Sequence, residues 1–182
     1  MGSGASIDDR ERKILKGRAA ILAVVPPTAP GDGELIRALR FSLGAETYAV
    51  ESKHIREVFP LPPLTPLPCV PPFVRGIINV RGRIVSIIDL KSILGLPDTE
   101  LSPSCSVIIL QSKGNEFGLL ADEISGLSAI PISSIQPSLP TLTEVRAEFL
   151  WGVTAEGLVL LDAGKLLSDR KLVIDETVGS TA

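Results

Sequence analysis

The chain has 182 residues, of which 45% are hydrophobic and 4% aromatic. A chain of this length can bury roughly 70% of its unfolded surface, so disorder of the whole chain is excluded. Eighteen basic and 21 acidic residues give a net charge of -3, which lacks the basic excess of a nucleic-acid binder, and we expect no nucleic-acid partner. His54 is the only histidine, and Cys69 and Cys105 lack C-x-x-C spacing, so we expect no metal and no other cofactor.

Residues 1–37 are interpreted as an N-terminal extension. Apolar residues at helical spacing predict a short amphipathic helix from about Asp8 to Val24, followed by the breaker-rich linker PPTAPGDG. The apolar stretch Ala19–Val25 follows acidic residues and ends at Pro26, which is unlike a signal peptide. No apolar run reaches the roughly 18 residues that a membrane-spanning helix needs. We therefore expect a soluble, cytoplasmic protein.

Strand patterns begin near Arg40. Phe41–Leu43 and Tyr48–Val50 flank a turn-like Gly-Ala-Glu and predict a hairpin, and Ile55–Phe59 alternates as a strand does. Residues 60–72, PLPPLTPLPCVPP, contain seven of the 15 prolines. Because proline removes the donors of a strand ladder, this segment is expected to be an extended surface connection.

The next segment predicts a second hairpin. Phe73–Arg75 is expected to form one helical turn, Gly76–Val80 and Arg83–Asp89 to pair around an Arg-Gly turn, and Leu90–Leu94 to form a short helix closed by glycine. Further strands are expected at Val107–Leu110, Phe117–Ala121, Ile124–Ile130, near Val153, and at Leu158–Leu161. Many short, closely spaced strands predict an all-β barrel or sandwich.

An internal repeat divides the chain into two similar halves. The matching positions are Tyr48, Ile55 and Val58 with Phe117, Ile124 and Leu127, then Phe73 and Gly76 with Phe149 and Gly152, then Asp89 with Asp162. Their order is the same in both halves, which predicts two small barrels at about 40–105 and 106–170. Residues 171–182 are then a C-terminal tail.

Few residues suggest chemistry. No phosphate-binding glycine motif and no nucleophile elbow is present, and Asp89 and Asp162 are interpreted as helix caps. Arg81 is expected at an exposed hairpin tip, with Glu57 as its nearest candidate partner. The enzymatic alternative is a small β-barrel enzyme that uses Cys69 or Cys105 with His54, although the proline-rich surroundings of Cys69 do not predict a lowered thiol pKa.

Several blocks in order resemble the CheW-type chemotaxis coupling family. They are FSLGAETY, IREV, the proline-rich connection, FVRGIINVRG and IIDL, and FGLLADEISG resembles the matching part of the second half; the likeness spans residues 38–170. The resemblance implies two intertwined five-stranded SH3-like barrels and an adaptor without catalytic residues. Family members couple methyl-accepting chemoreceptor tips to a CheA-type histidine kinase, so membrane association is expected only through receptors.

The resemblance also implies binding residues. Arg81 and Glu57 match a pair associated with receptor and kinase coupling. Ile55, Val58, Gly76 and Ile77 match positions that line or support a receptor groove, and the other wall is assigned to Leu120 and Ile124. Strand residues of a small barrel are often core residues only, which is the alternative for each apolar position. The alternative output is a CheW-like scaffold for a kinase in a non-motility chemosensory pathway.

Overall fold

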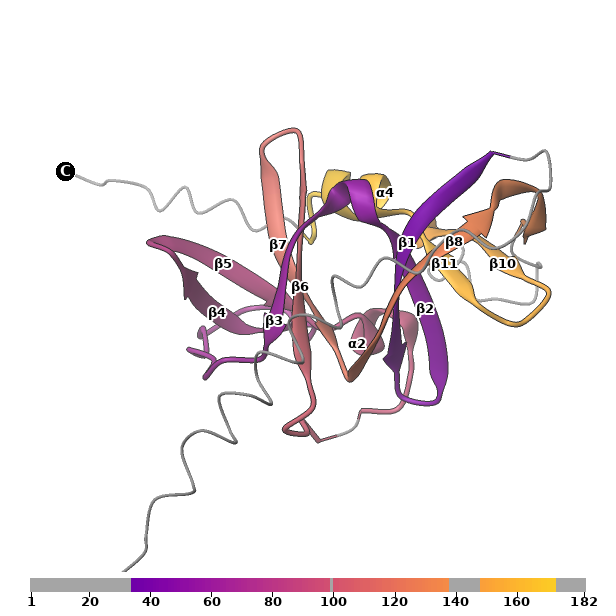
Figure 1. Cartoon of the computed structure of the whole chain (residues 1–182). Helices are drawn as coiled ribbons and strands as arrows, with labels where there is room; N and C mark the ends of the chain where they lie inside the picture. Colours follow the sequence, from indigo (N-terminus) through magenta and orange to yellow (C-terminus); the bar gives the residue numbers. More distant parts are fainter. Residues whose placement is uncertain (1–33, 99, 138–147, 173–182) are drawn as a thin grey trace, which may run out of the picture.

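The computed structural model describes residues 34–98, 100–137 and 148–172, and within them the chain is mostly β, which confirms the expected class (Figure 1). The helix expected at Asp8–Val24 lies outside the described residues. The strands are β1 (Leu35–Leu43), β2 (Glu46–Glu51), β3 (Ile55–Pro60), β4 (Val74–Val80), β5 (Arg83–Ile88), β6 (Ser106–Ser112), β7 (Asn115–Ala121), β8 (Glu123–Pro131), β9 (Ile135–Gln136), β10 (Leu150–Thr154) and β11 (Val159–Leu161). The helices are η1 (Ser52–His54), α2 (Leu90–Leu94), η2 (Ile132–Ser134) and α4 (Ala163–Ser168).

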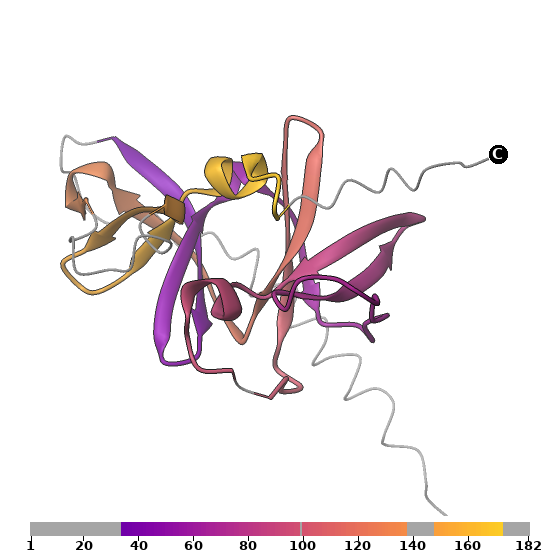
Figure 2. The same cartoon turned by 180° about the vertical axis from the view of Figure 1, so that it is seen from behind.

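The strands form two sheets, of which one has six strands rather than the expected five. The six-stranded sheet has the order β8-β1-β2-β11-β10-β9, and the five-stranded sheet has the order β3-β6-β7-β5-β4. Each sheet takes strands from both halves of the sequence repeat, and the two sheets lie on opposite sides of α2 and α4 (Figures 1 and 2). The halves are therefore intertwined, and the boundary near residue 105 divides the repeat but not the sheets.

Two hairpin turns have the geometry that their residues predict. Arg81 and Gly82 join β4 to β5 with φ of 52° and 84°, and Lys113 and Gly114 join β6 to β7 with φ of 50° and 89°. Positive φ at both central residues is the type I′ pattern, whose twist matches that of the flanking strands. Asn79 Oδ1 also accepts the Gly82 N–H at 2.7 Å. The turn therefore places Arg81 at the hairpin tip.

Two expectations about local structure are wrong. Phe73–Arg75 does not form a helical turn, because Val74 opens β4 opposite Ile88 and the Phe73 carbonyl accepts the Asp89 N–H at 2.8 Å. The segment assigned to the N-terminal extension also ends early, because β1 begins at Leu35 and pairs with the last residues of β8. In both cases the partner is distant in sequence, and pairing with it overrides the local pattern.

The repeated Gly76 and Gly152 mark places where another segment crosses a strand closely. A Cβ at Gly76 would lie 2.5 Å from the Thr65 carbonyl oxygen, and one at Gly152 would collide with the Gln136 carbonyl oxygen. Each glycine follows a register shift in its strand, and Gly76 has a φ of 147°. A side chain does not fit there, which gives the repeat of these glycines a steric cause.

Both α-helices pack on the core that the two sheets share. Helix α2 follows β5, and its Leu90 and Leu94 lie in the buried cluster to which strands of both sheets contribute. Helix α4 follows β11 of the six-stranded sheet and contacts β6 and β7 of the other sheet, where Asn115 Nδ2 donates to a carbonyl of α4 at 2.8 Å. The helices thus help to hold the sheets together.

The expected helix caps are confirmed. An oxygen of Asp89 accepts the backbone N–H of Lys91 at 2.9 Å, and an oxygen of Asp162 accepts that of Lys165 at 3.0 Å. Each carboxylate satisfies a donor that the first helical turn leaves without a partner inside the helix.

The close crossing at Gly76 generates a stability prediction. Gly76→Ala should lower the free energy of unfolding by at least about 3 kcal/mol, because strained φ and a backbone collision act together. The control is Gly157→Ala, where φ is 81° but nothing lies within 4 Å of the added Cβ, so only about 1–2 kcal/mol should be lost. Urea unfolding measures both variants, and equal losses would contradict the steric role of the crossing.

Candidate functional site

The pair expected at the hairpin tip is present. Arg81 Nη2 lies 2.9 Å from Glu57 Oε1, with side-chain exposure of 81% for Arg81 and 29% for Glu57. Both expectations, exposure at the tip and Glu57 as partner, are confirmed. Glu57 lies on β3 and Arg81 follows β4, which are the two edge strands of the five-stranded sheet. The ion pair therefore connects opposite edges of this sheet.

A short stretch of main chain joins the same two edges. The Thr65 N–H donates to the Ile77 carbonyl at 3.0 Å, and the Ile77 N–H donates to the Thr65 carbonyl at 2.9 Å. Thr65 belongs to the proline-rich connection expected over residues 60–72. Its first residue, Pro60, ends β3 instead, opposite Ser106, and the residues after it other than Thr65 form neither helix nor strand, as expected. The bridge holds that connection against β4, so Ile77 is positioned by the backbone and is half-buried.

A second ionic bridge that the sequence analysis missed lies beside the first. Arg83 donates to both carboxylate oxygens of Glu116, at 2.7 and 3.1 Å, and Arg56 Nη1 lies 3.5 Å from Glu116 and 3.3 Å from Gln111 Oε1. A register shift in β3 leaves Arg56 without a strand partner. The Lys-Gly turn between β6 and β7 places Gln111 opposite Glu116. The two-residue turn in the sequence could have predicted that Gln111 and Glu116 are opposite each other.

The apolar site residues fall into two groups. Ile55, Val58 and Ile124 are partly buried against one core cluster that both sheets share. Leu120, which was expected in a wall of the receptor groove, is instead fully buried in a different cluster within the five-stranded sheet, so it does not line a surface. Gly76 is buried beneath Thr65. Exposure therefore allows Ile55, Val58 and Ile124 to touch a partner, whereas Leu120 and Gly76 are placed to support the strands around them.

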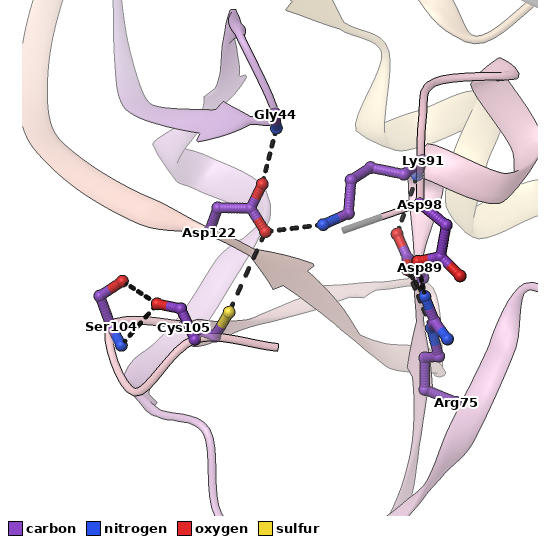
Figure 3. A network of polar contacts seen from close by, with 9 residues as sticks. Gly44, Arg75, Asp89, Lys91, Asp98, Ser104, Cys105 and Asp122 are labelled. Atoms are coloured by element: carbon purple, nitrogen blue, oxygen red, sulfur yellow. Dashed lines mark hydrogen bonds and ion pairs between the residues drawn. The ribbon is translucent and has the colours of Figure 1, made fainter. Parts of the chain in front are cut away.

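A buried polar network continues inward from β4 (Figure 3). Arg75 donates from Nε and Nη2 to Asp89 Oδ2 at 2.9 and 2.8 Å, and Nη2 also pairs with Asp98. Burial opposes the charge of Arg75, but hydrogen bonds and attraction from the two carboxylates outweigh it and raise its pKa. Arg75 thus stays charged and supplies the counter-charge that the fully buried Asp89 needs.

The residues of the enzymatic alternative lie in unlike surroundings. Cys69 is exposed in the proline-rich connection, and Cys105 is buried with its Sγ 4.0 Å from Asp122 Oδ1. His54 lies at the end of η1, as a junction residue before β3. The sulfur of Cys105 thus faces a carboxylate, which does not activate a thiol as a neighbouring imidazole does.

The described site thus combines exposed ion pairs with half-buried apolar side chains on two intertwined sheets, a composition suited to protein recognition. No helix within the described ranges is long and apolar enough to cross a membrane. Comparison with known proteins identifies the family, because the sequence matches the CheW-like domain over residues 37–171. The chain belongs to this family.

Relatives from several bacteria support the assignment. The chemotaxis protein CheW of Treponema pallidum (strain Nichols) is 29% identical over 153 residues, which are 80% of this chain and 89% of the relative. CheW of Thermotoga maritima is 33% identical over 129 residues, which cover 71% of this chain and 80% of the relative. Protein PilI of Pseudomonas aeruginosa is 30% identical over 153 residues, with 81% and 78% covered.

A solved structure shares the fold. The crystal structure of the scaffolding protein TtCheW from Thermoanaerobacter tengcongensis superposes with a TM-score of 0.68 at 27% sequence identity. The match covers 78% of this chain and 98% of that one. The resemblance proposed from the sequence is therefore confirmed for both family and fold class.

The exposure of the Arg81–Glu57 pair predicts a small role in stability. A double-mutant cycle with Arg81→Ala and Glu57→Ala should give a coupling energy below about 1 kcal/mol, because solvent screens an exposed pair. The same cycle on Arg83 and Glu116 should give a larger value, since Glu116 is better buried and receives two bonds. Urea unfolding measures both coupling energies. A larger coupling energy for Arg81–Glu57 than for Arg83–Glu116 would show that the Arg81–Glu57 pair stabilises the fold.

Proposed function

We propose that this protein is a non-catalytic adaptor that couples the cytoplasmic tips of chemoreceptors to a CheA-type histidine kinase. The observation that carries this proposal is the family match over residues 37–171, the same span that folds into the two sheets. The similarity to a structure described as a scaffolding protein supports a role in assembly. The receptor tips and the kinase of this proposal both lie in the cytoplasm, so the adaptor is proposed to be cytoplasmic as well. It would associate with the membrane only through the receptors.

The receptor side of this proposal rests on apolar contacts. A receptor tip is a helical hairpin, and an amphipathic helix binds by packing its apolar stripe against apolar side chains. Ile55, Val58 and Ile124 offer such side chains, because they are partly exposed while their inner faces pack on the shared core. Gly76, Ile77 and Leu120 then have a supporting role in the five-stranded sheet, which also carries Ile55 and Val58.

The kinase side rests on the charged hairpin. Arg81 projects from a rigid type I′ turn, and Glu57 holds its guanidinium from the opposite edge of the sheet. A fixed charge at the end of a sheet orients a partner and selects against partners that carry the same charge there. We therefore assign Arg81 and Glu57 to the orientation of the kinase or receptor.

The pathway that this adaptor serves is a separate question. Relatives named CheW and the relative named PilI match over comparable lengths, at 28–33% and 30% identity. The second candidate is a scaffold for a kinase in a non-motility chemosensory pathway, because the CheW-like domain itself does not specify the output. Identification of the kinase that co-purifies from the native cytosol with the tagged chain distinguishes the two pathways.

Reversal of the charge at the hairpin tip tests the interface. Arg81→Glu should weaken association with the kinase or with receptor membranes at least tenfold, because a like charge then faces Glu57 and the partner. Binding is measured by titration against purified kinase and, separately, by co-sedimentation with receptor membranes.

The matched control is Lys113→Glu. Lys113 occupies the same position of the other type I′ turn, at φ 50° against 52° for Arg81, so the substitution has the same charge change and backbone strain. The control should bind both partners as the wild-type chain does. Wild-type binding by a folded Arg81→Glu variant would remove Arg81 from the interface, and failure of the wild-type chain to bind either partner would contradict the adaptor function.

A further inference from the structure

An ion pair with a buried lysine lies where the two sheets meet. The Lys91 side chain is 1% exposed and that of Asp122 is 22% exposed, and Lys91 Nζ lies 2.7 Å from Asp122 Oδ1 (Figure 3). The other oxygen of Asp122 accepts the Gly44 N–H at 2.6 Å, and the Asp122 N–H donates to the Ser42 carbonyl at 3.0 Å. Asp122 therefore holds both a lysine of α2 and the turn between β1 and β2.

The position of each partner makes this pair a connection between sheets. Asp122 is the one residue between β7 of the five-stranded sheet and β8 of the six-stranded sheet. Gly44 belongs to the turn of the six-stranded sheet, whereas Lys91 lies in the helix that leaves β5 of the five-stranded sheet. Asp122, at the point where the chain passes from one sheet to the other, thus contacts the β1–β2 turn of the six-stranded sheet and the helix that follows β5 of the five-stranded sheet.

The connection continues to the candidate site at both ends. The backbone N–H of Lys91 donates to Asp89, and Asp89 receives the guanidinium of Arg75 on β4. Strand β4 ends at the turn that carries Arg81, and Ile124 lies two residues beyond Asp122 on β8. The polar contacts therefore run from Asp122, two residues before Ile124, to Arg75 near the start of β4, and strand β4 itself continues from there to the turn that carries Arg81.

Stability alone does not require these charges. Removing a lysine and a carboxylate from water costs free energy that their attraction only partly returns, and apolar replacement of such pairs is often neutral or stabilising. A buried ion pair can instead add conformational specificity, because its short, oriented contacts favour one arrangement of the groups that carry it. The Lys91–Asp122 pair lies where it can favour one relative arrangement of the two sheets.

We propose that Lys91 and Asp122 are positioning residues that set the relative placement of the two sheets, so that receptor binding near Ile124 is transmitted to the kinase contact at Arg81. This inference rests on the proposed function. Neither residue contacts a partner in it, so the pair governs the coupling between the two binding events and not the affinity of either one.

The test removes both charges while it keeps the shapes. The variant Lys91→Met/Asp122→Asn retains the length of the lysine stem and an oxygen that can accept the Gly44 N–H. Its binding to purified kinase and to receptor membranes is measured separately, and kinase autophosphorylation is then measured with receptor membranes present. We expect each affinity within about threefold of wild type and receptor-dependent kinase activation lowered at least tenfold.

The matched control is Lys165→Met/Asp162→Asn on α4. These residues carry the same charges beside the corresponding helix start, but the Lys165 side chain is 55% exposed and its nitrogen is 3.9 Å from Asp162. Asparagine also caps helices well, so the control should fold and activate as the wild type does. Full activation by the buried-pair variant, or loss of binary binding by it, would overturn the inference.

Two further measurements keep the outcomes separate. If the double variant does not fold, the single Lys91→Met variant is read in the same assays with the same expectations, because the Asp122 carboxylate that it leaves is 22% exposed and still accepts the Gly44 N–H. If the wild-type chain itself fails to activate the kinase, the proposed function fails, and residual dipolar couplings test the positioning role alone. A changed alignment of one sheet relative to the other in the variant supports that role, and an unchanged alignment overturns it.

Discussion

The apolar core shared by the two sheets is the constraint on which the rest of the structure depends. In β6, Ile108 and Leu110 point into the shared core, while Val107 and Ile109 point into a smaller cluster within the five-stranded sheet. Strand residues alternate between faces, so such a strand is buried on both. The six-stranded sheet has its own small cluster in the same way. Neither sheet can leave the other without exposing one complete apolar face.

This architecture suits a protein that holds its binding surfaces in fixed relative positions. The half-buried Ile55, Val58 and Ile124 pack on the shared core, and they come from both sheets. The Arg81–Glu57 pair spans the two edges of the five-stranded sheet, and the Lys91–Asp122 pair joins that sheet to its neighbour. A displacement of side chains at one binding surface is therefore passed on to the other surface, because the close-packed core between them moves as one body.

The sequence predicted features that neighbouring residues determine. The Arg-Gly turn and the Asp89 and Asp162 caps follow from local backbone chemistry. Glu57 was predicted as the partner of Arg81 although 24 residues separate them, and the intertwining of the halves was implied by the family resemblance. Other features set by distant pairing were not predicted. The strand at Val74, the bridge through Glu116 and the burial of Lys91 each require a register that no local pattern specifies.

Native-state hydrogen exchange tests the shared core most directly. The amides of β2, an inner strand of the six-stranded sheet, and of β6, an inner strand of the five-stranded sheet, are followed as denaturant is raised. Both groups should exchange through the same global opening, with equal free energies, because one core stabilises both sheets. Amides of β6 that open at a clearly lower free energy while those of β2 stay protected would show two independent units and would contradict a single shared core.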